Sequence, residues 1–223
     1  MLKALIFKEW LKIRWAALIS FAVFLLFMIK MTLNMSYAIR ILGANNFWYD
    51  IITRGVLFFD DLLYIPVLTG AVIAAFQFFP EISENRLKLT LHLPLRENAI
   101  LMYMTAMGSV TVLLVTAISL AVLSQITVLY FPTQVLNAVL LTTAPWLIAG
   151  LVSYFSTITI FVEPIWIKRV FFIAVSYLFI SELLGPERYN VFTYTLFPFL
   201  FIALFFSVSV LFPGHRFRKG VLK

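Results

Sequence analysis

Six apolar stretches along the chain limit what it can fold into. Each contains about 20 or more mostly apolar residues, the length that an α-helix needs to cross the hydrocarbon core of a bilayer. The stretches cover residues 15–35, 56–79, 100–123, 135–162, 165–184 and 191–212. Backbone groups without hydrogen bonds are too costly in lipid for other open structures, so six transmembrane helices are predicted. The expected fold class is an all-α membrane protein, with residues 1–223 forming a single membrane domain.

The composition agrees with a protein that faces lipid. Hydrophobic residues make up 63% of the chain and charged residues 12%, whereas soluble domains have roughly 45–50% and about 25%. A soluble chain of 223 residues could not bury this much apolar surface in one core.

Two groups of residues predict details of helix packing. Gly70, Ala71, Ala74 and Ala75 form small-xxx-small pairs on the second stretch, which permit a close approach between helices within the subunit. The fourth stretch contains Pro145 and Gly150. These two residues predict a kink or a shorter true span.

Basic residues are distributed unevenly between the two sides of the predicted helices. Thirteen of the 17 lysines and arginines lie in the amino-terminal segment, the carboxy-terminal tail and the links between spans two and three and between spans four and five. The basic side of a membrane protein is usually cytoplasmic, so we expect both termini in the cytoplasm and the chain in the cytoplasmic (inner) membrane. Topology therefore accounts for the net charge of +7, and no nucleic-acid partner is expected. The other four basic residues are Lys30, Arg40, Arg54 and Arg188.

Residue types that carry catalysis are few. The chain has no cysteine, which excludes disulfides, a thiol nucleophile and a thiolate metal site. Its two histidines, His92 and His215, lie outside the predicted spans. The H-E-x-x-H, G-x-S-x-G and G-x-x-x-x-G-K-[ST] motifs do not occur. We therefore assign no catalytic residue, metal or cofactor to the chain and do not expect an enzyme.

The longest cytoplasmic link, residues 80–97, mixes charged residues with leucines. Leucines at alternate positions suggest a strand, but others are spaced as in a helix, so periodicity leaves the backbone open. Two interpretations of the link also stay open. It is a solvated loop whose basic residues only set topology, or a docking element whose leucines enter a groove on a partner. The candidate partner-binding residues are Glu81, Glu84, Arg86, Leu87, Leu89, Leu93 and Arg96.

Residues 1–14 have the pattern of an amphipathic helix, with Glu9 on the apolar arc of its helical wheel. A carboxylate is not expected on that face of an interfacial helix. Either Glu9 pairs locally with Lys12 or reaches lipid headgroups, or it forms a buried pair with another cytoplasmic element. The arc consists of Leu2, Leu5, Ile6, Trp10 and Ile13.

Three ionisable residues, Lys30, Asp60 and Asp61, lie near the outer ends of the first two spans. Ionisable groups inside a bilayer are costly and therefore mark candidate functional sites. Either these groups lie at headgroup level or pair with each other, or they line an outer gate. Because opposite charges at similar depth offset each other's desolvation, we predict that Lys30 approaches Asp60 or Asp61.

The amino-terminal sequence LKALIFKEWLKIRW leads into the first of six spans, and an acidic, then leucine-rich link that ends in an L-P-L-R turn joins spans two and three. This layout resembles the permease subunits of type-two ABC transporters, a superfamily of exporters, over essentially the whole chain. The resemblance implies that residues 1–14, with Glu9 and Lys12, form an interfacial elbow helix. It also implies that residues 80–97 form a coupling helix in a groove of the ATPase. Such permeases often have re-entrant helices between spans five and six, whereas only a short segment near residues 185–189 separates these spans here.

The resemblance further implies partners. The chain would be the membrane-spanning subunit of an ATP-driven exporter and would act with a second copy or a paralogue. Because this chain has no phosphate-binding loop, the ATPase that binds ATP and Mg²⁺ would be a separate polypeptide. Two other functions stay open: a scaffold or assembly factor that binds another protein through the link, and an ion-driven carrier. Inverted repeats with broken helices would favour a carrier, and none are evident in the sequence.

Overall fold

The computed structural model describes residues 2–83, 97–185 and 188–218, and in these ranges the chain forms helices, turns and loops with no strand. The first half contains α1 (Leu2–Leu42), α2 (Ala44–Ile52), the short 3₁₀-helix η1 (Asp60–Leu62) and α3 (Ile65–Ser83). The second half contains α5 (Glu97–Tyr130), α6 (Thr133–Val162), α7 (Trp166–Leu184), α8 (Leu196–Ser209) and α9 (Leu211–Arg218).

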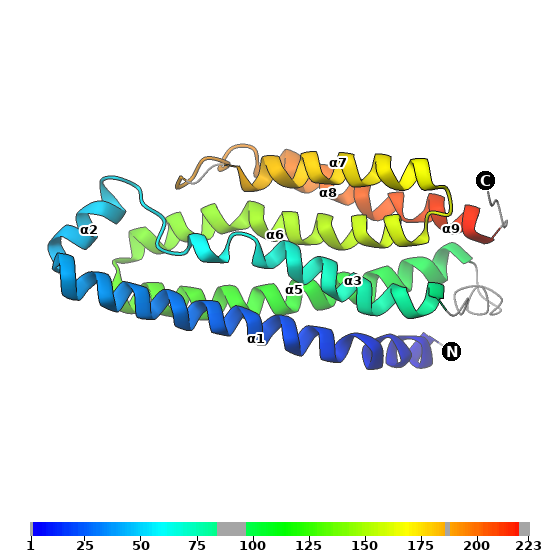
Figure 1. Cartoon of the computed structure of the whole chain (residues 1–223), viewed down its shortest axis with the longest axis horizontal. Coiled ribbons are helices and arrows are strands. Elements are labelled where there is room, and N and C mark those ends of the chain that lie inside the picture. Colours follow the sequence, from blue (N-terminus) through cyan, green and yellow to red (C-terminus); the bar gives the residue numbers. More distant parts are fainter. Residues whose placement is uncertain (1, 84–96, 186–187, 219–223) are drawn as a thin grey trace.

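The long helices run roughly along one direction and form a bundle (Figure 1). Helices α3, α5 and α6 form its middle, with α1 on one side and α7 and α8 on the other. The start of α1, the end of α3, the start of α5, the α6–α7 turn and α9 lie at one end, called here the terminal end. Helix α2, η1 and the turns before α8 lie at the opposite end, called here the distal end. Successive long helices therefore run back and forth, as a bundle that crosses a membrane repeatedly requires.

Among the described residues, five helical segments are long and apolar enough to cross a membrane. The predicted fifth span is present as α7, but its 19 residues include Lys168, Arg169 and Glu182. That is more charge than a span of this length ordinarily holds. The all-α fold with several candidate spans is thus confirmed, while the count of six is not. The five segments are Lys3–Leu42, Asp60–Ser83, Asn98–Tyr130, Thr133–Val162 and Leu196–Gly214.

Helix α1 continues unbroken through the segment expected to be a separate elbow helix. No glycine or proline interrupts its first two turns, so the backbone has no reason to bend there. At 41 residues the helix is about 60 Å long, roughly twice the thickness of a hydrocarbon core. Leu5 and Ile13 are buried against the bundle, so this segment packs on protein. A distinct elbow helix is not confirmed.

The second span and the link both begin later than expected. Residues 56–59 are not helical, and α3 starts at Ile65 after η1, where the Asp60 carboxylate accepts the backbone N–H of Asp61 at 2.9 Å. Pro66 lies in the first turn of α3, where the missing N–H of proline costs no hydrogen bond. At the other end, α3 continues past Pro80 to Ser83. Residues 80–83 are therefore helical, and α5 begins at Glu97.

Helix α2 and the start of α8 were also not foreseen. Gly43, with a φ of 78°, separates α1 from α2, and Phe47 and Ile51 of α2 pack into the distal half of the bundle. Turns occupy residues 188–195, so α8 starts at Leu196 rather than near residue 191. A nine-residue helix is too short to appear as an apolar stretch, which explains why α2 was missed.

Helices α3 and α6 cross at Gly70 of α3 and Gly150 of α6. A Cβ atom built on Gly70 would lie 2.1 Å from the backbone carbonyl oxygen of Gly150. One built on Gly150 would lie 2.8 Å from the carbonyl oxygen of Pro66. The close approach predicted from the small residues of the second span is therefore present within the subunit. Helix α6 runs unbroken for 30 residues with Pro145 inside it.

Candidate functional site

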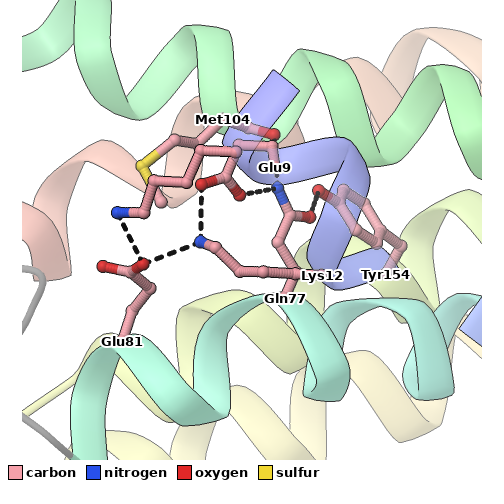
Figure 2. Close-up of polar contacts among 7 residues, drawn as sticks. Glu9, Lys12, Gln77, Glu81, Met104 and Tyr154 are labelled. Carbon is pink, nitrogen blue, oxygen red and sulfur yellow. Dashed lines mark hydrogen bonds and ion pairs between the residues drawn. The ribbon is translucent and has the colours of Figure 1, made fainter. Parts of the chain in front are cut away.

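Charged and polar side chains gather at the terminal end of the bundle, between α1, α3, α5 and α6 (Figure 2). On α1, Glu9 and Lys12 are three residues apart, and on α3, Gln77 and Glu81 are four apart. These spacings put each pair on one face of its helix. The two faces meet, and the side chain of Tyr154 reaches them from α6. We call this group the terminal network.

The ionic part of the network contains two carboxylates and two ammonium groups. The Nζ atom of Lys12 lies 2.5 Å from Oε1 of Glu9 and 2.7 Å from Oε1 of Glu81. The Nζ atom of Lys8 lies 2.9 Å from the same oxygen of Glu81. The side chains of Glu9 and Glu81 are only 1% exposed, while that of Lys12 is 16% exposed. The formal charges of these four groups cancel, so the pairs stabilise carboxylates that burial alone would disfavour.

Gln77 connects this ionic part to two further helices. Its Nε2 group donates to Oε2 of Glu9 at 2.9 Å and to the backbone carbonyl of Met104 on α5 at 2.7 Å. Its Oε1 atom accepts a hydrogen bond of 2.7 Å from the hydroxyl of Tyr154, which is also 3.1 Å from the backbone carbonyl of Thr105. Gln77 and Tyr154 are both fully buried. The terminal network therefore joins four helices through hydrogen-bonded polar groups, the condition under which such groups tolerate burial.

The terminal network consists of contacts between helices. Within the described ranges, no cluster of three or more His, Cys, Asp or Glu side chains is arranged to hold a metal ion. What the geometry provides is a set of discrete contacts across helix boundaries. Separating the helices would leave carboxylates or an ammonium group unpaired in an apolar environment, so the contacts favour one specific arrangement of α1, α3, α5 and α6.

Of the two interpretations of Glu9, the local pair with Lys12 is present. Glu9 pairs with Lys12 on its own helix and also accepts a hydrogen bond from Gln77 of another helix. Glu81, expected to contact a partner protein, is buried inside this chain. The other predicted link residues, Glu84, Arg86, Leu87, Leu89, Leu93 and Arg96, lie outside the described residues.

Asp61 lies in η1 at the distal end, where it meets Lys30 of α1, far from the terminal network. The predicted approach is confirmed for Asp61, whose Oδ1 atom is 2.6 Å from Nζ of Lys30. The carboxylate of Asp60 instead accepts the backbone N–H of Asp61. The side chains of Lys30 and Asp61 are 55% and 27% exposed.

A second ion pair of the terminal end was not foreseen from the sequence. Glu163, fully buried after the last turn of α6, accepts from Nη1 of Arg216 on α9 at 2.7 Å. The guanidinium Nε of Arg169 on α7 donates to the Glu163 backbone carbonyl at 2.5 Å. This pair ties the α6–α7 turn to α9. A glutamate followed by proline at the end of a long apolar stretch was the available sequence signal, but nothing in the spacing pointed to Arg216.

Gln77 and Tyr154 were also not recognised as network members. The available signal for Gln77 was its position one turn before Glu81, which places both residues on one helix face. Tyr154 is one hydroxyl-bearing residue among several in the fourth stretch. Their contacts depend on how α3 and α6 cross, which no local pattern specifies.

The long apolar helices and the alternating connections are compatible with a multi-pass helical membrane protein. No protein-family model matches the chain, and no curated protein or solved structure is significantly similar to it.

Proposed function

We propose that this chain is the membrane-spanning subunit of an ATP-driven transporter of the type-two ABC exporter class. ATP and Mg²⁺ would be bound by a separate ATPase subunit, and the permease would work with a second copy or a paralogue. The sequence layout, the bundle of long apolar helices and the position of the terminal network support this proposal. A permease needs no catalytic group. It needs a mechanical connection between a cytoplasmic partner and its spans.

Glu81 is the observation that carries the proposal. It lies in the last turn of α3, three residues before the 84–96 segment. Lys12 holds its carboxylate against α1, and Lys12 also contacts Glu9. From Glu9 the hydrogen bonds continue through Gln77 to α5 and α6. A displacement of the 84–96 segment would therefore act on four helices, as coupling to an ATPase requires.

In this mechanism, closure of the ATPase pair on ATP moves the 84–96 segment and the end of α3. Packed interfaces change between discrete arrangements and do not deform continuously. The bundle would alternate between two packings that open the pathway first to one side of the membrane and then to the other. The terminal network stabilises one of these packings.

We further propose that α7 is the sixth span and that the terminal end is cytoplasmic. The charged residues Lys168 and Arg169 lie in the first turn of α7, and Glu182 lies in its last turn, so residues 170–181 between them are uncharged. Lys3, Lys8, Lys12 and Arg14 also lie at this end, in the first turns of α1. An excess of basic residues favours the cytoplasmic side. A reporter fused after Lys223 should then lie in the cytoplasm. A reporter fused at Asn45 should lie on the opposite side of the membrane. An exterior signal at the carboxy terminus contradicts six spans.

The decisive experiment tests whether the 84–96 segment binds an ATPase. Replacing both Leu89 and Leu93 with Asp should release the ATPase while the protein stays inserted, because apolar segments elsewhere determine insertion. The readouts are the ATPase that co-purifies from the native membrane and the ATP hydrolysis of the complex. Ile167→Asp is the matched control, since Ile167 is an exposed apolar residue in the first turn of α7, and that helix starts at the same end of the bundle.

Each outcome of this experiment has a clear meaning. Loss of the ATPase in the Leu89 and Leu93 variant, with retention in the Ile167 variant, supports the proposal. An intact complex with normal hydrolysis contradicts the coupling role of the segment. If the native chain binds a protein without a nucleotide-binding loop, the scaffold function replaces the transporter.

A second experiment separates binding from coupling. Glu81→Gln keeps the shape of the side chain but removes the charge that Lys12 holds. We expect this variant to retain the ATPase, because the 84–96 segment is unchanged, and to hydrolyse ATP several-fold more slowly in the complex. Unchanged hydrolysis would show that the terminal network does not transmit the movement.

A further inference from the structure

A cavity of about 220 Å³ lies between α6, α7 and α8, on the side of the bundle away from α1. Its walls are Phe171 and Phe172 from α7 and Phe205 and Phe206 from α8. Phe171 and Phe205 are each 62% exposed, so the cavity opens on the outer surface of the bundle. An enclosed apolar cavity of about 150 Å³ is enough to bind benzene. This one therefore has room for a ring or several methylene groups.

Hydroxyl-bearing residues also line this mostly apolar cavity, and none of its lining residues is charged. Ser156 and Thr159 from α6, Ser176 from α7 and Ser209 from α8 contribute hydroxyl groups, and no charged side chain lines the cavity. Ionised groups are costly in an apolar environment without a partner of opposite charge. The cavity is therefore suited to a ligand with an apolar body and a neutral polar group.

Ser156 indicates where that polar group would bind. Its side chain is 97% buried, and its Oγ atom is the only buried side-chain nitrogen or oxygen in the described part of the chain that has no hydrogen-bond partner. Thr142, Thr143 and Thr159 on the same helix each donate to the carbonyl four residues earlier, whereas Ser156 does not. A buried hydroxyl without a partner destabilises the protein. Neighbouring atoms cover the Oγ atom in this conformation, so the hydroxyl has to turn toward the cavity before a ligand group can accept from it and remove this cost.

The hydroxyls of Thr159 and Ser209 indicate that the ligand should also donate a hydrogen bond. Thr159 has the Phe155 carbonyl at 2.9 Å and Ser209 has the Phe206 carbonyl at 2.7 Å, so both donate to backbone. Their oxygens, 3.2 Å apart, keep lone pairs that accept hydrogen bonds. A ligand hydroxyl that accepts from Ser156 has its own proton to donate to Thr159 or Ser209.

We propose that the cavity between α6, α7 and α8 binds a neutral alcohol with an apolar body, which enters from the surrounding bilayer. A plain acyl chain would fill the phenylalanine walls but leave the Ser156 hydroxyl unpaired. A charged headgroup would find no counter-charge. This binding site goes beyond the proposed transport function, because it requires neither an ATPase nor coupling.

The test uses two photoreactive probes on the purified full-length protein in phosphatidylcholine vesicles. One probe is a diazirine derivative of dodecanol, and the other is the diazirine hydrocarbon of equal length without the hydroxyl. We expect the alcohol to label the α7 and α8 peptides saturably, unlabelled dodecanol to displace it, and the hydrocarbon to label them far less. Ser156→Ala should weaken binding of the alcohol about tenfold, the loss of one hydrogen bond to a buried group.

Two controls come from the chain itself. Ser181→Ala removes an exposed hydroxyl of α7 that already donates to the Leu178 carbonyl, and it should leave labelling unchanged. The groove of about 260 Å³ between α1 and α5 has a single hydroxyl, that of Thr32, which donates to the Met28 carbonyl. Both probes should label that groove equally.

Several results would overturn the proposal. Equal labelling of the α7 and α8 peptides by the two probes would show that the cavity is an ordinary lipid groove. An unchanged affinity in Ser156→Ala would show that its hydroxyl bonds to its own helix. Absence of saturable labelling would also refute the proposal. This includes the case in which a second copy of the chain covers the cavity and protects it from the probes. Ser176→Leu, which fills the cavity, should abolish labelling if the site is correct.

Discussion

The two ends of the bundle contain ion pairs of similar length in different surroundings. At the terminal end, Lys12 lies 2.5 Å from Glu9, which is 1% exposed. At the distal end, Lys30 lies 2.6 Å from Asp61, and both side chains are substantially exposed. Distance therefore does not distinguish the two pairs. The difference is what surrounds each charge when its pair separates: water or headgroups at the distal end, apolar protein at the terminal end.

The largest predicted effect comes from removing the central ammonium of the terminal network. Lys12→Ala leaves the buried Glu9 carboxylate without its cation, and we expect a loss of about 3–5 kcal/mol in the free energy of unfolding. Thermal unfolding of the protein in detergent measures this change. A double variant that combines Lys12→Met with Glu9→Gln should recover most of the loss. In this variant position 9 has no charge that requires Lys12. A loss below about 1 kcal/mol in Lys12→Ala would mean that the terminal network behaves like a surface pair.

The neutral part of the terminal network should contribute less. Gln77→Leu removes the amide that bonds to Glu9, Met104 and Tyr154. Leaving buried polar groups unsatisfied costs about 1–3 kcal/mol, and we expect a loss of this size under the same unfolding conditions. As a matched control, Gln125→Leu on α5 removes an amide outside the terminal network. Equal losses in the two variants would contradict a special role for Gln77.

Removing one hydroxyl should have a smaller effect. Tyr154→Phe keeps the ring that packs edge-on against Phe155 and deletes only the hydrogen bonds to Gln77 and to the Thr105 carbonyl. A net loss of about 1 kcal/mol is expected. The double variant with Gln77→Leu should lose less than the sum of the two single losses, because the residues share a contact. Strict additivity would show that the contact contributes nothing.

The smallest effect is predicted at the distal end. Lys30→Ala removes an exposed pair, and the free energy of unfolding should change by less than about 1 kcal/mol. The change should shrink further at high salt, which screens exposed charges. A loss comparable to that of Lys12→Ala would show that lipid or another subunit buries Lys30 and Asp61, and would restore the outer-gate interpretation.

The sequence predicted an all-α fold with several long apolar helices, because apolar length reports directly on the bilayer, although the count of six spans is not confirmed. The pairing of Lys30 with Asp61 was also accessible, since the two opposite charges lie near the same end of consecutive spans. Gln77, Tyr154 and the Glu163–Arg216 pair were not predicted, because their contacts depend on how distant helices cross. The uninterrupted course of α1 was missed for a different reason. The family resemblance suggested a separate elbow, whereas the local residues contain nothing that would break the helix.

The contact between Gly70 and Gly150 has a consequence for how the bundle moves and opens. Because the backbones of α3 and α6 are in contact at this crossing, the two helices cannot slide past each other without collisions. We therefore expect them to move as one rigid body. Motion would then occur where side chains separate the helices, on the flanks formed by α1 and by α7 and α8. Amide hydrogens of α3 and α6 near the crossing should exchange with solvent deuterium last, after those of both flanks.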